Sequence, residues 1–280
     1  MPKTKKTYKK VEQPDFPKWN VLLKDACTIE GVVSDCYSLF RDYSVGNQML
    51  AFWQCKKRDI VPGPIGTYRF WESIGRHVVS GPGSAIYLSQ PVTWKKTETD
   101  ASGNEASVQH TSFKYLPHWF VLSQTEGEPY ELPELPGFDL GNAIVSLEIE
   151  PVEFTSTQGN CMGYAEGRTF AVNPLGKHQM ATTMHEIAHI VLGHTDGQGV
   201  SDLKNRTPRS IMELEAEATA LIILDQLGDK DHKESRGYIQ AWYKDKEVPE
   251  ENARRIFRAA NQILRSGRTS YRRDDNGTTV

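Results

Sequence analysis

The chain has 280 residues, of which 38% are hydrophobic and 25% are charged, and its formal net charge is −3. This composition is typical of a globular protein, and no run of 18 apolar residues is present that could cross a membrane. The basic N-terminus has no apolar segment behind it and the four cysteines form no CxxC pair, so we expect a cytoplasmic protein with free thiols, no secretory signal and no membrane partner.

The first half of the chain changes from a helical to a strand-like pattern. Residues 1–16 are predicted to be a disordered basic tail, because five of the first ten residues are lysines. Residues 17–57 show helical periodicity, with Ser44 as an N-cap. Further along, alternating apolar residues predict strands, and a polar stretch at Glu98–Ser107 predicts a loop. The predicted strands are Thr67–Trp71, Ala85–Leu88, Val92–Lys96 and Lys114–Leu122.

A proline-rich segment at 126–139 is the predicted linker between two domains. The charge balance also changes there. Residues 1–125 carry 16 Lys and Arg against 11 Asp and Glu, whereas the remaining residues carry 17 against 25. Only the first part therefore suits a polyanion. We predict an α+β protein with domains at 17–125 and 140–267, followed by a disordered tail at 268–280.

The second domain is predicted to be mostly helical with a small β-sheet. Strands are expected near Ser146–Phe154 and at Cys161–Asn173, the latter folded about Glu166 and Gly167. Apolar residues at helical spacing then predict four helices. These helices span about 178–193, 211–228, 232–246 and 250–266.

The residues His185-Glu186-Ile187-Ala188-His189 form an HExxH motif on the first of these helices. Histidines four residues apart lie on one face of a helix and can share a metal ion. Apolar residues surround the motif, and two buried histidines need polar partners, so a metal site is favoured over histidines paired within a core. Zn²⁺ accepts imidazole nitrogen readily, with Mn²⁺ as an alternative, and Glu186 is placed to be the general base.

The third ligand is expected from the next helix, where the sequence offers Glu213, Glu215 and Glu217. On a helical projection Glu213 and Glu217 share an apolar face and Glu215 points away. Glu213 can also be explained by a capping box with Ser210. We therefore prefer Glu217 as the ligand and keep Glu213 as the alternative. His194 lies too far round the first helix to join the pair.

The segments HEIAHIVLGH, ELEAEATALIIL and YIQAWYKDKEVPEENARRIFRAANQIL resemble the metallopeptidase domain of ArdC-type antirestriction proteins. The first domain is similar to the other part of that family at Tyr43-Ser44, Asn47-Gln48 and Tyr68-Arg69-Phe70-Trp71. The resemblance implies a domain that binds single-stranded DNA at 17–125 and a zincin-like metallopeptidase domain at 140–267, with Glu217 on the family's ligand helix. It also implies a protein of plasmids and other mobile elements that protects incoming DNA from restriction.

Single-stranded DNA is bound by basic grooves with aromatic faces for base stacking. The candidates in the first domain are basic, aromatic and amide side chains. They are Tyr43, Asn47, Gln48, Arg69, Trp71, Arg76, Lys95, Lys96 and Lys114. The alternative function is a regulatory zinc protease that cleaves a protein such as a repressor, with a first domain that recognises protein. In a third interpretation the zinc only stabilises the fold.

Overall fold

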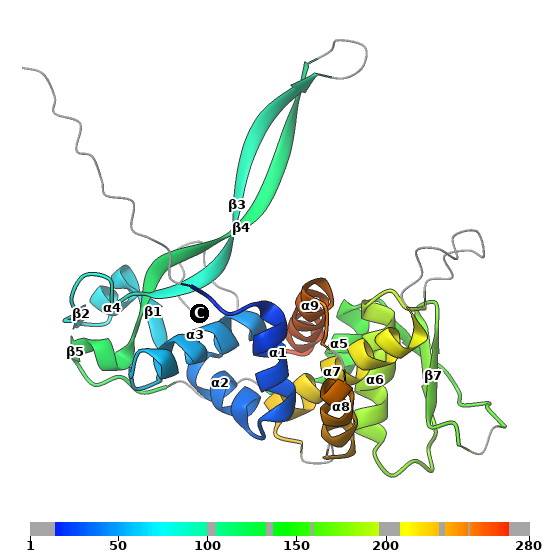
Figure 1. Ribbon diagram of the computed structural model, residues 1–280. Coiled ribbons are helices and arrows are strands. Elements are labelled where there is room, and N and C mark those ends of the chain that lie inside the picture. Colours follow the sequence, from blue (N-terminus) through cyan, green and yellow to red (C-terminus); the bar gives the residue numbers. More distant parts are fainter. Residues whose placement is uncertain are drawn as a thin grey trace, which may run out of the picture.

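The computed structural model describes residues 15–99, 105–132, 137–157, 160–195, 208–229, 233–245 and 247–268. The predicted tails lie outside these residues, except for Asp15, Phe16 and Arg268. The architecture is mixed α+β, with sheets in the N-terminal part and a helix-rich C-terminal part (Figure 1). None of the helices in the described part is long and apolar enough to cross a membrane.

The helical pattern predicted for residues 17–57 is confirmed as three helices. They are α1 (Trp19–Thr28), α2 (Val32–Phe40) and α3 (Val45–Lys57). Ser44 is the N-cap of α3, as predicted, and its side-chain oxygen accepts a hydrogen bond from the backbone N–H of Asn47 at 3.4 Å. The three helices bury one continuous set of apolar side chains from Trp19 to Cys55.

The strand predicted at Thr67–Trp71 is wrong for most of its length. Strand β1 covers only Ile65–Thr67, and α4 begins immediately afterwards at Tyr68–Ser73. The Thr67 hydroxyl accepts a hydrogen bond from the N–H of Phe70 at 3.2 Å, so this residue caps the short helix. Beyond α4, β2 (Arg76–Val78) pairs with β5 (Thr125–Gly127), and η1 (Leu122–Gln124) precedes β5.

One long antiparallel hairpin projects from the body of the molecule (Figure 1). Its strands are β3 (Ile86–Thr99) and β4 (Glu105–Val121), and β1 pairs with the base of β4. The segments predicted as separate strands at Ala85–Leu88 and Val92–Lys96 thus belong to β3. Part of the predicted loop at Glu98–Ser107 is strand, and its middle lies outside the described residues.

The four helices predicted for the second half are confirmed. They are α6 (Gln179–Val191), α7 (Arg209–Leu227), α8 (Lys233–Asp245) and α9 (Glu250–Gly267). The hairpin predicted at Cys161–Asn173 is present as β7 (Gly163–Glu166) and β8 (Thr169–Val172). The strand predicted near Ser146–Phe154 is reduced to β6 (Glu150–Pro151), and β6-β8-β7 is the strand order of the sheet. Helix α5 (Leu140–Ser146), capped by Asp139, was not predicted.

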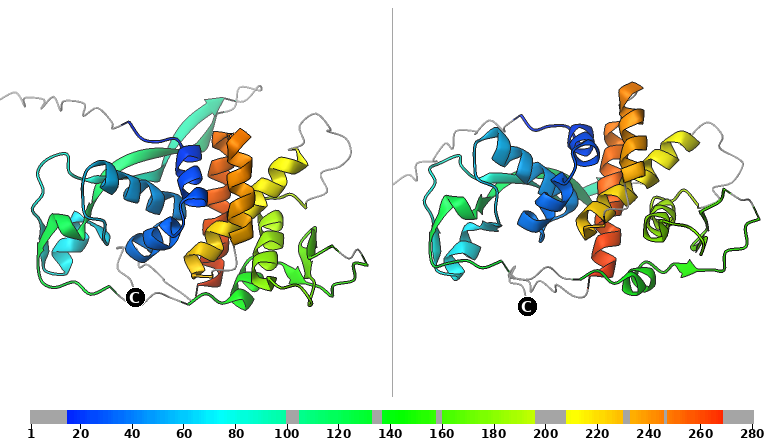
Figure 2. Two further views of the ribbon diagram at one scale, coloured as in Figure 1. Left: turned by 60° about the horizontal axis from the view of Figure 1, so that its bottom comes forward. Right: turned by 90° about the horizontal axis from the view of Figure 1, so that it is seen from below.

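The N-terminal helices pack directly against the C-terminal ones, and α9 lies beside α1 (Figure 2). A single cluster of buried hydrophobic side chains runs from Trp19 to Leu264. A buried hydrogen bond also joins the two parts, because the Gln226 amide on α7 donates to the Gln48 carbonyl oxygen on α3 at 2.8 Å. The two parts predicted as separate domains therefore share one hydrophobic core.

Candidate metal centre

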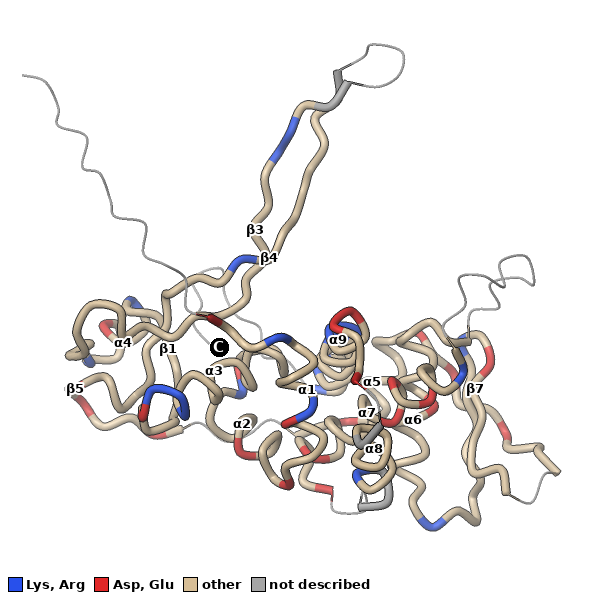
Figure 3. Tube along the Cα trace, in the orientation of Figure 1, with Lys and Arg blue, Asp and Glu red and all other residues tan. Residues whose placement is uncertain are grey.

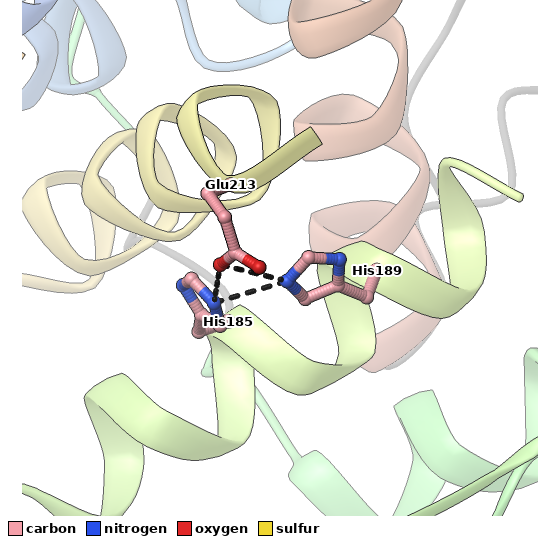
Figure 4. Close-up of side chains that lie close together, drawn as sticks. All are labelled: His185, His189 and Glu213. Carbon is pink, nitrogen blue, oxygen red and sulfur yellow. Dashed lines mark hydrogen bonds and ion pairs between the residues drawn. The ribbon is translucent and has the colours of Figure 1, made fainter. Parts of the chain in front are cut away.

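Helices α6 and α7 bring two histidines and one glutamate together (Figure 4). The Nε2 atoms of His185 and His189 lie 3.1 Å apart, and Oε2 of Glu213 lies 3.5 Å from each of them. The three side chains are partly exposed, with 22%, 13% and 38% of their surfaces accessible. The site is thus formed inside the fold and is reachable from outside.

The triangle of donor atoms fits a tetrahedral zinc ion. With ligands at about 2.0–2.1 Å, such an ion separates its donors by roughly 3.3 Å. The observed edges of 3.1 and 3.5 Å bracket that value. Two imidazole nitrogens and one carboxylate oxygen also form a donor set that zinc accepts, with a fourth position left for water or substrate.

Glu217, the preferred third ligand in the sequence analysis, occupies a different place from Glu213. Its Oε2 lies 2.7 Å from Nδ1 of His185, the nitrogen that does not face the cluster. Both carboxylates share a face of α7, as the projection predicted, but Glu213 is the one that reaches the two Nε2 atoms. We therefore assign Glu213 as the candidate ligand and Glu217 as a partner of His185.

The capping box proposed for Ser210 and Glu213 is wrong. Helix α7 begins at Arg209 with Pro208 at its N-cap, so Ser210 lies inside the helix, and no side chain caps this end. The Glu213 carboxylate instead lies near the two histidines and 3.5 Å from Nε of Arg209. The earlier helix start therefore removes the structural role that made Glu213 the second choice.

Glu215 points away from the face that Glu213 and Glu217 share, as the projection predicted, but its side chain is fully buried rather than exposed. Helix α7 is buried on nearly all sides beyond Leu214, so the face opposite the ligands packs inside the protein. The Glu215 carboxylate lies 2.9 Å from Nε2 of His194, whose Nδ1 lies 2.9 Å from Nδ1 of His189. His194 is not in the ligand triangle, but it contacts His189 at Nδ1, the ring nitrogen that does not face the triangle.

The carboxylates around His185 determine the charge of the cluster. Burial alone would lower the pKa of His185, but hydrogen bonds donated to Glu213 and Glu217 outweigh this effect and raise the pKa to about 10. The hydrogen bond with His185 lowers the pKa of Glu213 to about 2. Burial and then the positive charge on His185 lower the pKa of His189 to about 4. Near neutral pH, His185 is therefore the one of the three candidate ligands that holds an extra proton.

Glu186 lies next to the cluster, against strand β7. Its side chain is buried, and burial raises the pKa of the carboxyl group to about 7. A Cβ atom on Gly163 would lie 2.9 Å from Oε1 of Glu186 and 2.7 Å from Cγ2 of Thr182. Glycine at this position of β7 therefore allows the strand and the carboxyl group to approach closely.

The nine candidate DNA-binding residues divide by burial. Asn47, Gln48 and Trp71 are buried, and each uses its polar atoms inside the fold. The Asn47 amide exchanges two hydrogen bonds with the backbone of Ser89, and the Trp71 indole N–H donates to the carbonyl of Phe120 at 3.0 Å. Asn47 and Trp71 thus hold α3 and α4 to the hairpin, whereas the Gln48 amide donates to the carbonyl of Tyr43 and accepts from Gln226. We therefore remove all three from the candidate interface.

Two further candidates are engaged within the protein. Tyr43 is half-buried, and its hydroxyl donates to the carbonyl of Ile65 at 3.3 Å. The Arg76 guanidinium donates to the Thr125 hydroxyl at 2.9 Å and to nearby backbone carbonyls. The remaining four candidates are exposed to solvent. They are Arg69 on α4 and Lys95, Lys96 and Lys114 on the hairpin.

The fold and the site together define a mixed α+β protein with a candidate His/His/Glu metal centre built on an HExxH helix. No protein-family model matches the chain, and no curated protein matches it. The structure is similar to two crystal structures of the antirestriction protein ArdC from plasmid R388. The metal-free one is 17% identical with a TM-score of 0.47, and the alignment covers 89% of this chain and 94% of that one. The Mn(II)-bound one is also 17% identical, with a TM-score of 0.45 and coverages of 90% and 96%.

Proposed function

We propose that this chain is an antirestriction protein of the ArdC kind that binds single-stranded DNA and carries a zinc metallopeptidase-like site. The observation that carries the proposal is the triangle formed by His185, His189 and Glu213, with edges of 3.1 and 3.5 Å. The sequence segments around these residues resemble that family. One zinc ion per chain is the proposed cofactor, with Mn²⁺ as the alternative metal.

Hydrolysis is the chemistry that suits this site. A zinc ion held by His185, His189 and Glu213 would supply a Lewis acid that lowers the pKa of a water molecule. Glu186 would accept the water's proton and return it to the leaving amine. Strand β7 lies at the edge of its sheet and against Glu186, so its free side can receive an extended peptide.

The hairpin is the proposed surface for single-stranded DNA. Alternate residues of a strand face the same side, and the register pairs Trp94 with His110, Lys96 with Val108 and Gln90 with Lys114. One face of the hairpin thus presents a stacked Trp94–His110 pair, with ring centroids 5.8 Å apart, between two lysines. The two lysine positions lie about 20 Å apart along the strands.

Exposure and charge support this surface. Trp94 on this face is 44% exposed, and Phe113 on the opposite face of the hairpin is 61% exposed, so aromatic rings are open to stacking on both faces. Within residues 86–97 and 107–121 the only charged side chains, histidines aside, are Lys95, Lys96 and Lys114. Figure 3 shows the basic positions along the projecting strands. A phosphate backbone would meet no carboxylate on this part of the hairpin.

The second candidate function is a regulatory protease, which the position of β7 beside Glu186 favours. Glu186→Gln separates the two functions, because it keeps the size of the side chain and removes its ability to take up a proton. The test is the transfer of unmodified plasmid DNA into a restricting host, with purified Glu186→Gln protein assayed in parallel for DNA binding. If protection depends on DNA binding alone, the variant still protects. Loss of protection with intact DNA binding would instead establish the protease.

A further inference from the structure

Behind His189, on the side away from the ligand triangle, three side chains form a buried chain of hydrogen bonds. We propose that His194 and Glu215 are positioning residues that fix the ring of His189 and thereby set the affinity of the metal site. This inference rests on the metal site of the proposed function. The side chain of His194 is 4% exposed and that of Glu215 is 0% exposed, so solvent does not substitute for either contact.

When Glu215 is a carboxylate and the His194 ring carries a single proton, the polar atoms of this chain have one consistent assignment of protons. Ionised Glu215 can only accept, so Nε2 of His194 carries a proton and donates to it at 2.9 Å. Nδ1 of the neutral His194 ring then lacks a proton and accepts from Nδ1 of His189 at 2.9 Å. With its proton on Nδ1, His189 has a free lone pair on Nε2, the atom that faces Glu213. The chain therefore selects the tautomer of His189 that can bind a metal.

Helix α9 supplies two further partners that hold the Glu215 carboxyl group in place. The Asn252 amide donates to Oε1 of Glu215 at 2.9 Å, and Nη1 of Arg255 lies 3.5 Å from the same oxygen. A buried carboxylate needs this compensation, because an isolated charge is strongly disfavoured away from water. Arg255 also donates to the carbonyl of Leu192 at 2.8 Å, so α9 holds the C-terminal end of α6 as well as the Glu215 carboxyl group.

The end of α6 brings His194 back towards His189. Gly193 has a φ of 73°, a left-handed conformation that glycine adopts without strain. The turn is closed by hydrogen bonds from the N–H of Gly193 to the carbonyl of Ile190 at 3.0 Å and from the N–H of His194 to the carbonyl of His189 at 2.9 Å. A residue five positions after the ligand can therefore reach the ligand's own ring.

The two ligand histidines are thus held in different ways. His185 donates from Nδ1 directly to the carboxylate of Glu217 at 2.7 Å. His189 reaches its carboxylate only through a second imidazole, so the metal-binding tautomer of His189 depends on His194. Each partner should contribute to metal affinity independently, because Glu217 and His194 contact different rings.

The test is an equilibrium zinc titration of the full-length protein against a chelator of known affinity. We expect His194→Phe, which keeps a ring but loses both nitrogens, to weaken zinc binding by roughly 10–100-fold. In His194→Asn a side-chain oxygen stands near the position of Nδ1, so we expect it to recover part of that loss. Glu215→Gln keeps an acceptor for His194 and should lose less than His194→Phe. The absorption spectrum of bound Co²⁺ should change in His194→Phe, because one ligand is released from its fixed orientation.

Asp225→Asn is the matched control. Asp225 lies on α7, as Glu215 does, but outside the metal site, where it forms a buried ion pair with Arg236 of α8 at 3.1 Å. The control should lose stability without losing zinc affinity or changing the Co²⁺ spectrum. Circular dichroism of the metal-free proteins shows which variants fold, and His194→Asn and Glu215→Gln decide the question if His194→Phe does not.

Two results would overturn the inference. One is zinc affinity in folded His194 and Glu215 variants equal to that of the parent protein. The other is an equal loss in Asp225→Asn, which would make the effect one of general stability. If the parent protein itself binds no stoichiometric zinc, the proposed metal site fails, and that outcome is distinct from both.

Discussion

Oε2 of Glu217 lies 2.7 Å from Nδ1 of His185, on the opposite side of the imidazole from the Nε2 atom that faces Glu213. The two glutamates are one helical turn apart on α7 and contact opposite edges of the same ring. One is therefore suited to bind the metal and the other to orient the histidine that binds it.

Substitution of these two glutamates should have unequal effects on metal content. Glu213→Ala removes a ligand atom, and we expect it to abolish stoichiometric zinc binding at micromolar protein. Glu217→Ala leaves all three ligand atoms in place and should weaken binding by roughly 10–100-fold while stoichiometric zinc is still retained at saturation. Metal analysis of dialysed proteins, followed by chelator competition, measures both. Equal loss in the two variants would show that Glu217 also ligates the ion.

Metal binding should release a proton. In the metal-free protein the pKa of His185 is about 10, whereas those of Glu213 and His189 are about 2 and about 4. Between about pH 8 and 9 His185 is therefore the ligand that still holds a proton, and the metal must displace it. Apparent affinity should fall as the pH is lowered from 10 and level off above it.

Calorimetric titration in buffers of different ionisation enthalpy counts the protons released. We expect at least one per zinc ion in this range, because His185 gives up its proton and a coordinated water can give up another. Release of none would mean that His185 is neutral before the metal arrives, and that its carboxylate partners do not hold a proton on the ring.

Gly193→Ala should reduce stability and metal affinity together. A side chain at a φ of 73° costs roughly 1–2 kcal/mol, and the resulting shift moves His194 away from His189. Gly228→Ala is the matched control, because Gly228 ends α7 with a φ of 72° and has open space around it. Thermal unfolding should show similar losses for both variants, and only Gly193→Ala should bind zinc more weakly. A similar fall in zinc affinity for both variants would show that the turn at Gly193 does not act on the metal site through His194.

The three lysines of the hairpin should carry the salt dependence of DNA binding. For single strands each neutralised phosphate contributes about 0.7 to the slope of log K against log salt concentration, so replacing Lys95, Lys96 and Lys114 with alanine should lower the slope by about 2. The charge-matched control replaces three exposed lysines elsewhere. They are Lys24 on α1 and Lys56 and Lys57 on α3. Fluorescence anisotropy with a labelled single strand measures both variants, and equal slopes for the two would remove the hairpin from the interface.

The sequence predicted the helices well because their signals are local. Ser44 caps α3 as its side chain requires, and the turn at Gly167 lies where the glycine predicts it. The strand predicted at Thr67–Trp71 is wrong because the Thr67 hydroxyl caps a helix at this point, and alternation of apolar residues does not reveal that cap. Short segments of this kind are decided by one hydrogen bond.

Part of the metal site could also be predicted from local sequence signals. His185, Glu186 and His189 share one helix, so their spacing alone places them. The roles of Glu213, Glu215 and Glu217 depend on what lies opposite each face of α7, and a helical projection cannot show that α9 covers one of them. Asn47 and Gln48 were expected on the surface as polar residues, but Ser89 and Gln226 satisfy them inside the fold.

The most direct test of the metal centre is a crystal of the zinc-loaded protein measured at the zinc absorption edge. We predict one anomalous peak per chain, about 2.0–2.2 Å from Nε2 of His185, Nε2 of His189 and a carboxylate oxygen of Glu213. Glu217 should lie outside the coordination sphere with its oxygen on Nδ1 of His185. A fully zinc-loaded crystal with no peak between these three side chains, or with Glu217 rather than Glu213 on the ion, would contradict the account.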